Sequence, residues 1–162
     1  MGIQFNADEI FSVAVKIEEN GAAFYRKAAE IHKGDSHASL LENLAKMEDV
    51  HKKIFLEMKD SLAAVYSAEK SFDPYQEAML YLNAMADAHG GEGSPSAADA
   101  LTGKETIQEI LDIALGLEKK SILYYTGLKD LVPERLGKEH LETIINEEKN
   151  HVAQLQQVKA QL

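Results

Sequence analysis

Two pairs of residues in this chain share one composition and one spacing, a glutamate followed three positions later by a histidine. They are Glu48 with His51 and Glu148 with His151. On an α-helix, residues three apart lie on one face about one turn apart, so each pair would present a carboxylate and an imidazole together. Such oxygen and nitrogen ligands bind transition metals. One pair can arise by chance on a helix surface, whereas two pairs indicate a metal site.

Two more glutamates, Glu18 and Glu118, belong with these pairs because their helical neighbours are apolar or small. The positions three and four residues away hold only alanine, valine, glycine, leucine, serine or isoleucine. Burying an unpaired carboxylate costs several kcal/mol, and four close together would be prohibitive without compensating charge. Two divalent cations would balance four carboxylates. The predicted ligands of this metal pair are Glu18, Glu48, His51, Glu118, Glu148 and His151.

Long helices must carry these residues. Proline is absent from 1–73, 96–132 and 134–162, and apolar residues recur there at spacings of three and four. No segment alternates polar and apolar residues between turn signals, so we predict an all-α fold without a sheet. The four predicted helices run from about Asn6 to His32, from Ser36 to the mid-sixties, from Thr102 to Leu131, and from Pro133 to the C-terminus.

The connection between the second and third helices is long. Residues 73–88 predict a short extra helix, and residues 89–103, rich in glycine, serine and proline, predict a loop. We place the start of the third helix at Thr102 because Thr102 and Glu105 have the spacing of a capping box.

The two halves of the chain repeat each other with a period of 100 residues. Ten positions are identical between 9–59 and 109–159 without a gap, including the glutamates and histidines above. In each half, the first glutamate lies fifteen residues before the predicted turn and the second fifteen after it. An antiparallel hairpin puts both at one height, about 22 Å from the turn at ~1.5 Å per residue. Packing the hairpins together would therefore bring all four glutamates to one level.

The composition excludes several functions. The 162 residues predict a single domain over 1–162. Seventeen Lys and Arg against 27 Asp and Glu give a net charge of −10, which argues against nucleic-acid and membrane partners. No segment approaches the ~20 apolar residues of a membrane span, and no secretory signal is visible, so we expect a cytoplasmic protein. The absence of cysteine excludes disulfides and thiolate-bound clusters.

The ligand pattern resembles that of a known family. One glutamate from each of two helices plus Glu-x-x-His from each of two others is the pattern of ferritin-like di-iron four-helix bundles. The amino-acid sequences of 17–25, 117–125 and 145–151 are similar to those of rubrerythrin and its relatives, and the resemblance covers nearly the whole chain. It implies a ferritin-like bundle in which the 66–103 connection crosses over, so that the third helix runs parallel to the second.

The resemblance also implies roles for the ligands. Glu48 and Glu148 would bridge two irons, although manganese or zinc could take the same ligands. The terminal ligands would be Glu18, Glu118, His51 and His151. Rubrerythrins carry an extra glutamate one turn after the ligand on the third helix. Here that position is Ser121, which leaves a more symmetric set, as in bacterioferritin-like centres.

Three functions follow from this resemblance. The first is a di-iron oxidoreductase that reduces peroxide or dioxygen in oxidative stress. Its electrons would come from an external donor protein, since a chain without cysteine holds no rubredoxin domain. For this enzyme we expect a homodimer. The second is a bacterioferritin-like ferroxidase or iron-storage protein, built as a shell of about two dozen subunits. The third is a non-catalytic helical module that keeps metal for stability.

Four further residues have a predicted place near the ligands. Tyr25 and Tyr125 lie two turns from Glu18 and Glu118 on the same helix faces, either as core aromatics or as hydrogen-bond donors to the carboxylates. Gly21 and Gly116 lie inside helices, where we expect them to allow close packing.

Overall fold

The computed structural model of the protein describes residues 7–65, 80–82, 84–85, 96–132, 134 and 137–162. These residues are helical or irregular, and no strand occurs among them. None of the described helices combines the length and apolar character needed to cross a bilayer. The helices are α1 (Ala7–Ile31), α2 (Ala38–Val65), α4 (Ala97–Ala100), α5 (Ile107–Leu131) and α6 (Lys138–Ala160).

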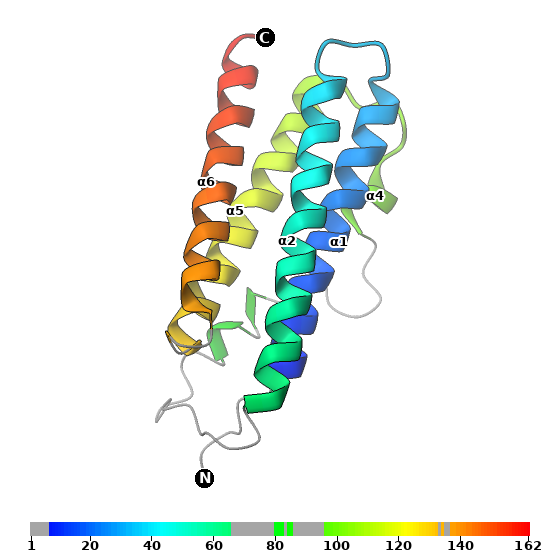
Figure 1. The fold of residues 1–162 in the computed structure, drawn as a ribbon. Helices are drawn as coiled ribbons and strands as arrows, with labels where there is room; N and C mark the ends of the chain where they lie inside the picture. Colours follow the sequence, from blue (N-terminus) through cyan, green and yellow to red (C-terminus); the bar gives the residue numbers. More distant parts are fainter. Residues whose placement is uncertain (1–6, 66–79, 83, 86–95, 133, 135–136) are drawn as a thin grey trace.

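The four long helices form a bundle of two antiparallel hairpins, α1 with α2 and α5 with α6 (Figure 1). Helices α2 and α5 run in the same direction, so the end of α2 and the start of α5 lie at opposite ends of the bundle. The predicted all-α four-helix bundle with one long crossover connection is therefore confirmed.

The first hairpin follows the sequence prediction closely. Helix α1 ends one residue before His32, and the chain turns through Gly34, whose φ of +89° is a left-handed conformation that glycine adopts without strain. Asp35 Oδ1 then accepts a hydrogen bond of 3.0 Å from the backbone N–H of His37, just before α2 begins. Asn6, the predicted first residue of α1, lies outside the described residues.

The start of α5 at Ile107 corrects the prediction of Thr102. The predicted contact forms, since the backbone N–H of Thr102 donates to Glu105 Oε1 at 2.6 Å. This hydrogen bond closes a turn instead of capping a helix, because Gly103 follows Thr102 with a φ of +89°. The next Thr-x-x-Glu pair is the true cap: Thr106 Oγ1 accepts from the N–H of Glu109, and Glu109 accepts from the N–H of Thr106.

The start of α6 also differs from the prediction. The helix begins at Lys138, after Gly137 with a φ of +104°, instead of at Pro133. Pro133 itself lies outside the described residues.

The crossover contains helical pieces. Residues 80–82 and 84–85 are helical, as predicted for 73–88, and the rest of that predicted helix lies outside the described residues. Helix α4 lies in the stretch predicted as a loop, where Ser96 and Asp99 form a capping box. Lys27 on α1 holds it in place, because its Nζ donates to the carbonyl oxygens of Ala98 and Leu101 at 2.8 and 3.1 Å.

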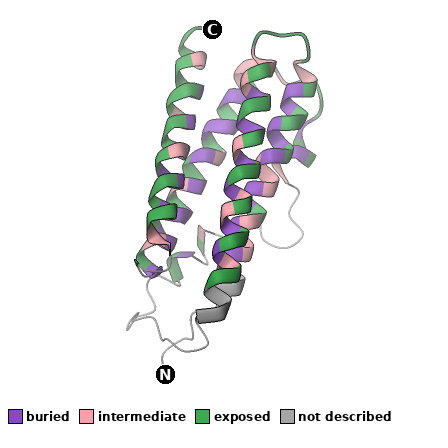
Figure 2. Ribbon diagram, viewed as in Figure 1, coloured by how far each residue is buried: buried purple, intermediate pink, exposed green. Residues whose placement is uncertain are grey.

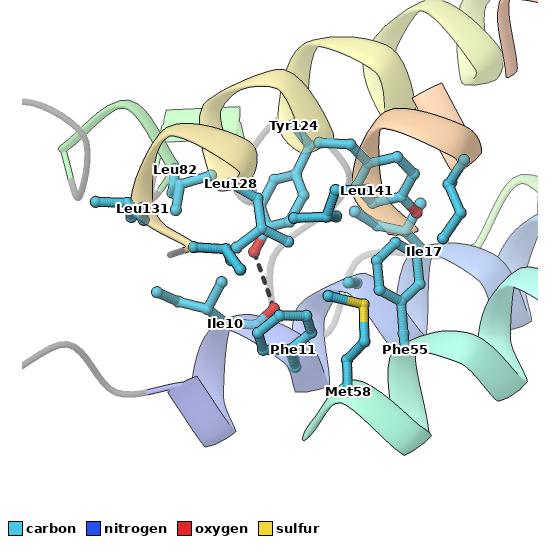
Figure 3. Close-up of a cluster of buried hydrophobic side chains, with 14 of the residues drawn as sticks. Ile10, Phe11, Ile17, Phe55, Met58, Leu82, Tyr124, Leu128, Leu131 and Leu141 are labelled. Carbon is cyan, nitrogen blue, oxygen red and sulfur yellow. Dashed lines mark hydrogen bonds between the residues drawn. The ribbon is translucent and has the colours of Figure 1, made fainter. Parts of the chain in front are cut away.

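Apolar side chains fill the bundle in two clusters at different heights, and the buried stripe of each helix faces the interior (Figure 2). The cluster in Figure 3 lies toward the start of α1, where the Tyr124 hydroxyl donates to the Ile10 carbonyl at 3.1 Å. The other lies toward the α1–α2 turn and includes Phe24 and Leu155. On every long helix the predicted metal ligands lie between these two clusters.

Candidate metal centre

The structure brings all six predicted ligands together. They form two groups of four, and within each group one ligand atom per residue lies within 4.8 Å of all the others. Two residues, Glu48 and Glu148, belong to both groups. The first group is Glu18, Glu48, His51 and Glu148, and the second is Glu48, Glu118, Glu148 and His151.

This sharing is the geometry that two adjacent metal ions need. Glu48 and Glu148 lie where a carboxylate could contact both ions, which fits the bridging role that the family resemblance implies. His51 accompanies Glu18 on one side, with its Nδ1 3.6 Å from Glu18 Oε2. His151 accompanies Glu118 on the other, with its Nδ1 3.5 Å from Glu118 Oε1.

The cluster is dry. Each of the six ligand residues is at most 4% exposed. The apolar clusters above and below exclude water from the ends of the bundle. Charges in such a place interact strongly, because little solvent screens them.

Two tyrosines donate to the carboxylates across the bundle. The hydroxyl of Tyr25 on α1 donates to Glu118 Oε1 on α5, and that of Tyr125 on α5 donates to Glu18 Oε1 on α1. Burial and the nearby carboxylates raise the pKa of both phenols well above the usual value, so they remain donors. The donor interpretation of the two tyrosines thus holds, and Glu18 Oε2 is left without a hydrogen-bond partner among the described residues.

Three of the four ligand carboxylates have a raised pKa. Burial, with repulsion from neighbouring carboxylates, raises the pKa of Glu18 and Glu48 well above the usual range. Burial likewise raises the pKa of Glu118 to about 8. Glu148 differs: burial would raise its pKa too, but contacts with His151 and His51 hold it below the usual value.

The neighbouring carboxylates raise the pKa of both histidines. Burial alone would lower the pKa of each imidazole, but Glu148 and its neighbours raise that of His51 to about 9. Glu118 and Glu148 raise that of His151 to about 10. A cation entering the cluster would therefore displace protons from its ligands.

Unpaired polar atoms show that the residues fit metal ions. Within the described part of the chain, four buried atoms have no hydrogen-bond partner: Glu18 Oε2, Glu48 Oε1, His51 Nδ1 and Glu148 Oε1. His51 Nδ1 is 2.9 Å from Glu148 Oε1, but the two are not aligned as a hydrogen bond. An unsatisfied buried group costs about 1–3 kcal/mol, and these four all belong to predicted ligands. Cations bound there would satisfy them.

The predicted role of the helical glycines holds for one of the two. A Cβ on Gly21 would lie 2.8 Å from Glu48 Oε2, so only glycine leaves that carboxylate its place. Gly116 has open space around it, because no packing partner among the described residues lies within 4 Å of the position that a Cβ would occupy. The prediction of close packing at Gly116 is therefore wrong.

A small cavity of about 40 Å³ reaches Glu48 and Glu118 from the side of α1 and α5. Its walls include Asn20, Gly21 and Ser121. Ser121 is small and its hydroxyl donates to the Leu117 carbonyl at 3.1 Å, so the position keeps space beside the ligands. The volume suits a molecule of a few atoms.

One contact of the cluster escaped the sequence analysis. Glu147 Oε2 accepts from His51 Nε2 at 2.7 Å, which links α6 to α2 on the outer side of the imidazole. Glu147 precedes Glu148 by one residue, which places it off the helix face that carries the ligands. The only sequence signal for Glu147 is that the two halves of the repeat differ there, because the equivalent residue is Met47.

Comparisons with known proteins agree with this geometry. The family model described as rubrerythrin matches residues 9–159. Among solved structures, a Thermotoga maritima protein described as a candidate ferritin-like diiron-carboxylate protein is similar, with 28% identity and a TM-score of 0.68. The match covers 99% of this chain and 98% of that one. The search of curated proteins gave no match. The fold is ferritin-like, and the chain belongs to the rubrerythrin family.

Proposed function

We propose that the protein is a non-haem di-iron oxidoreductase that reduces peroxide, or alternatively dioxygen, with electrons from another protein. One observation carries the proposal: two ligand groups share Glu48 and Glu148 in a dry core. A mononuclear site needs no such sharing. Iron suits the four carboxylates and two imidazoles, and manganese or zinc are the other candidates.

The chain's own residues prepare this chemistry in three ways. The tyrosine hydroxyls of Tyr25 and Tyr125 orient Glu118 and Glu18 across the bundle. The apolar clusters keep bulk water away. The cavity beside Glu48 has room for a small oxidant. An iron pair held here would supply two electrons, the number needed to convert one peroxide and two protons into two waters.

A second candidate is the ferroxidase or storage function of bacterioferritin type. Ser121 favours it, because the symmetric set without an additional glutamate is the one the resemblance assigns to those centres. The two functions differ in assembly. We propose a homodimer for the oxidoreductase, whereas storage needs a closed shell.

The proposal includes the partners. The oxidant is a small molecule, and the electron donor is a separate protein because this chain has no cysteine for a rubredoxin centre. With a net charge of −10, the protein binds neither nucleic acid nor an anionic membrane. We place it in the cytoplasm.

Stopped-flow oxidation of the iron-loaded protein tests the function. We expect anaerobically loaded protein to be oxidised rapidly by hydrogen peroxide, with one peroxide consumed per two irons. Preference for dioxygen, with continued oxidation of added Fe(II) into a mineral, would favour the ferroxidase instead. Oxidation no faster than that of free Fe(II) would contradict both and leave the non-catalytic module. Glu139→Gln, on the exposed face of α6, is the control and should behave like wild type.

A further inference from the structure

The two halves of the centre differ at one position beside it. In the 100-residue repeat, Glu147 on α6 corresponds to Met47 on α2. In the structure, Glu147 Oε2 accepts a 2.7 Å hydrogen bond from His51 Nε2. Met47, which is partly buried, has an uncharged thioether in place of that carboxylate.

The Glu147 contact holds the outer nitrogen of His51. Because Nε2 donates outward, Nδ1 is the nitrogen left to bind a metal, and it lies 2.9 Å from Glu148 Oε1. That Nδ1 has no hydrogen-bond partner among the residues that the structure describes. A carboxylate on the outer nitrogen of a metal-binding histidine fixes the ring and makes it a stronger ligand.

His151 presents the same nitrogen to the cluster, and the difference lies on its outer side. Its Nδ1 lies 3.0 Å from Glu148 Oε2 and 3.5 Å from Glu48 Oε1, so these contacts run through the nitrogen that faces the cluster. In the 100-residue repeat, Met47 corresponds to Glu147 and His151 corresponds to His51. The repeat therefore assigns Met47, instead of a carboxylate, to the outer nitrogen of His151. A thioether is a weak acceptor without charge and cannot replace a carboxylate there.

We infer that Glu147 is a positioning residue that makes the two metal sites unequal, so that the first ion binds beside His51 and the second beside His151. The inference rests on the proposed metal centre and adds the order in which it fills. Loss of such an outer carboxylate lowers metal affinity about 10–100-fold. The Glu147 side chain is 34% exposed, so solvent screens it in part and we expect the lower end of that range, about tenfold.

Zinc titration followed by NMR of the histidine ring nitrogens tests this order. Zinc(II) is diamagnetic and does not change oxidation state, so the readout is independent of activity. In ¹⁵N-histidine-labelled metal-free protein, we expect the first equivalent to shift His51 and the second to shift His151. Glu147→Met should make both histidines shift together and weaken binding of the first zinc about tenfold. Glu147→Gln, which keeps an uncharged acceptor, should give an intermediate preference.

The matched control exchanges the two residues. The double variant Met47→Glu/Glu147→Met keeps the composition and net charge, and it should reverse the order of filling. A contact that only joined α2 to α6 would not produce that reversal. Simultaneous shifts in the wild type, or an unchanged order in Glu147→Met, would overturn the inference. If neither histidine responds to zinc, the proposed metal centre fails as well, which distinguishes that failure from a wrong order.

Discussion

Replacing Glu148 by glutamine should empty the metal centre, whereas replacing Glu18 should empty only half of it. Glu148 and Glu48 belong to both ligand groups, but Glu18 and Glu118 each belong to one. Sites with four ligands bind zinc with about 10–16 kcal/mol, so one ligand contributes on the order of 3 kcal/mol, about a hundredfold in affinity. Losing a shared ligand weakens both sites by that amount.

Metal analysis after anaerobic loading with iron and gel filtration measures this difference. We expect near zero iron in Glu48→Gln and Glu148→Gln, about one per chain in Glu18→Gln and Glu118→Gln, and about two in wild type. Glutamine keeps the shape of the side chain, so a lost fold is not the cause of lost metal. Glu139→Gln on α6 is the matched control and should retain the wild-type content. Equal iron in Glu148→Gln and wild type would show that the site is assigned wrongly.

The stability of the protein should depend on pH in opposite directions with and without metal. In the metal-free fold, the pKa of Glu118 is raised by burial to about 8, and carboxylate neighbours raise that of His51 to about 9. Groups with a raised pKa stabilise the fold fully below their unfolded values, near 4.5 and 6.5, and lose that contribution as pH rises through the folded values. The metal-free protein should therefore become less stable from about pH 5.5 to pH 8.

The contribution of Glu148 to the pH dependence of stability has the opposite sign, but it does not alter the expected loss of stability above pH 5.5. Its pKa is lowered, so its contribution is lost only as pH falls below the usual value of 4.5. With metal present, deprotonated ligands bind more tightly as pH rises, and the loss disappears.

Thermal unfolding with and without excess zinc measures the effect. If the free energy of unfolding of the metal-free protein falls by about 3 kcal/mol over this pH range, its Tm falls by on the order of 10 °C for a chain of this length. We expect such a fall in the metal-free protein and a level or rising Tm with zinc. Zinc should not change the slope in Glu148→Gln, which separates binding at the cluster from weak surface effects. Parallel curves for wild type with and without zinc would contradict the proton exchange described above.

The sequence contained most of the site because a helix converts spacing into geometry. Glu48 and His51 share a face at any position in the bundle, and the equal distances of the glutamates from the two turns put them at one height. The 100-residue repeat then paired Glu18 with Glu118 and Tyr25 with Tyr125. In the structure even the crosswise hydrogen bonds of the two tyrosines follow this symmetry.

The parts that the sequence could not predict depend on local competition or on contacts between helices. Thr102 with Glu105 and Thr106 with Glu109 have the same spacing, and the spacing does not show that Gly103 takes a φ of +89° within the first pair while the second pair caps α5. The contact of Glu147 with His51 joins residues 96 positions apart. No periodicity along one helix encodes which outer residue of α6 reaches an imidazole on α2.

Anomalous diffraction from crystals of the iron-loaded protein tests the central claim most directly. The account predicts two iron peaks per chain, about 3.5–4 Å apart, as in other two-metal sites. Both should lie between Glu48 and Glu148, one beside His51 and the other beside His151. A single peak, or iron bound elsewhere with the six side chains free of metal, would contradict it.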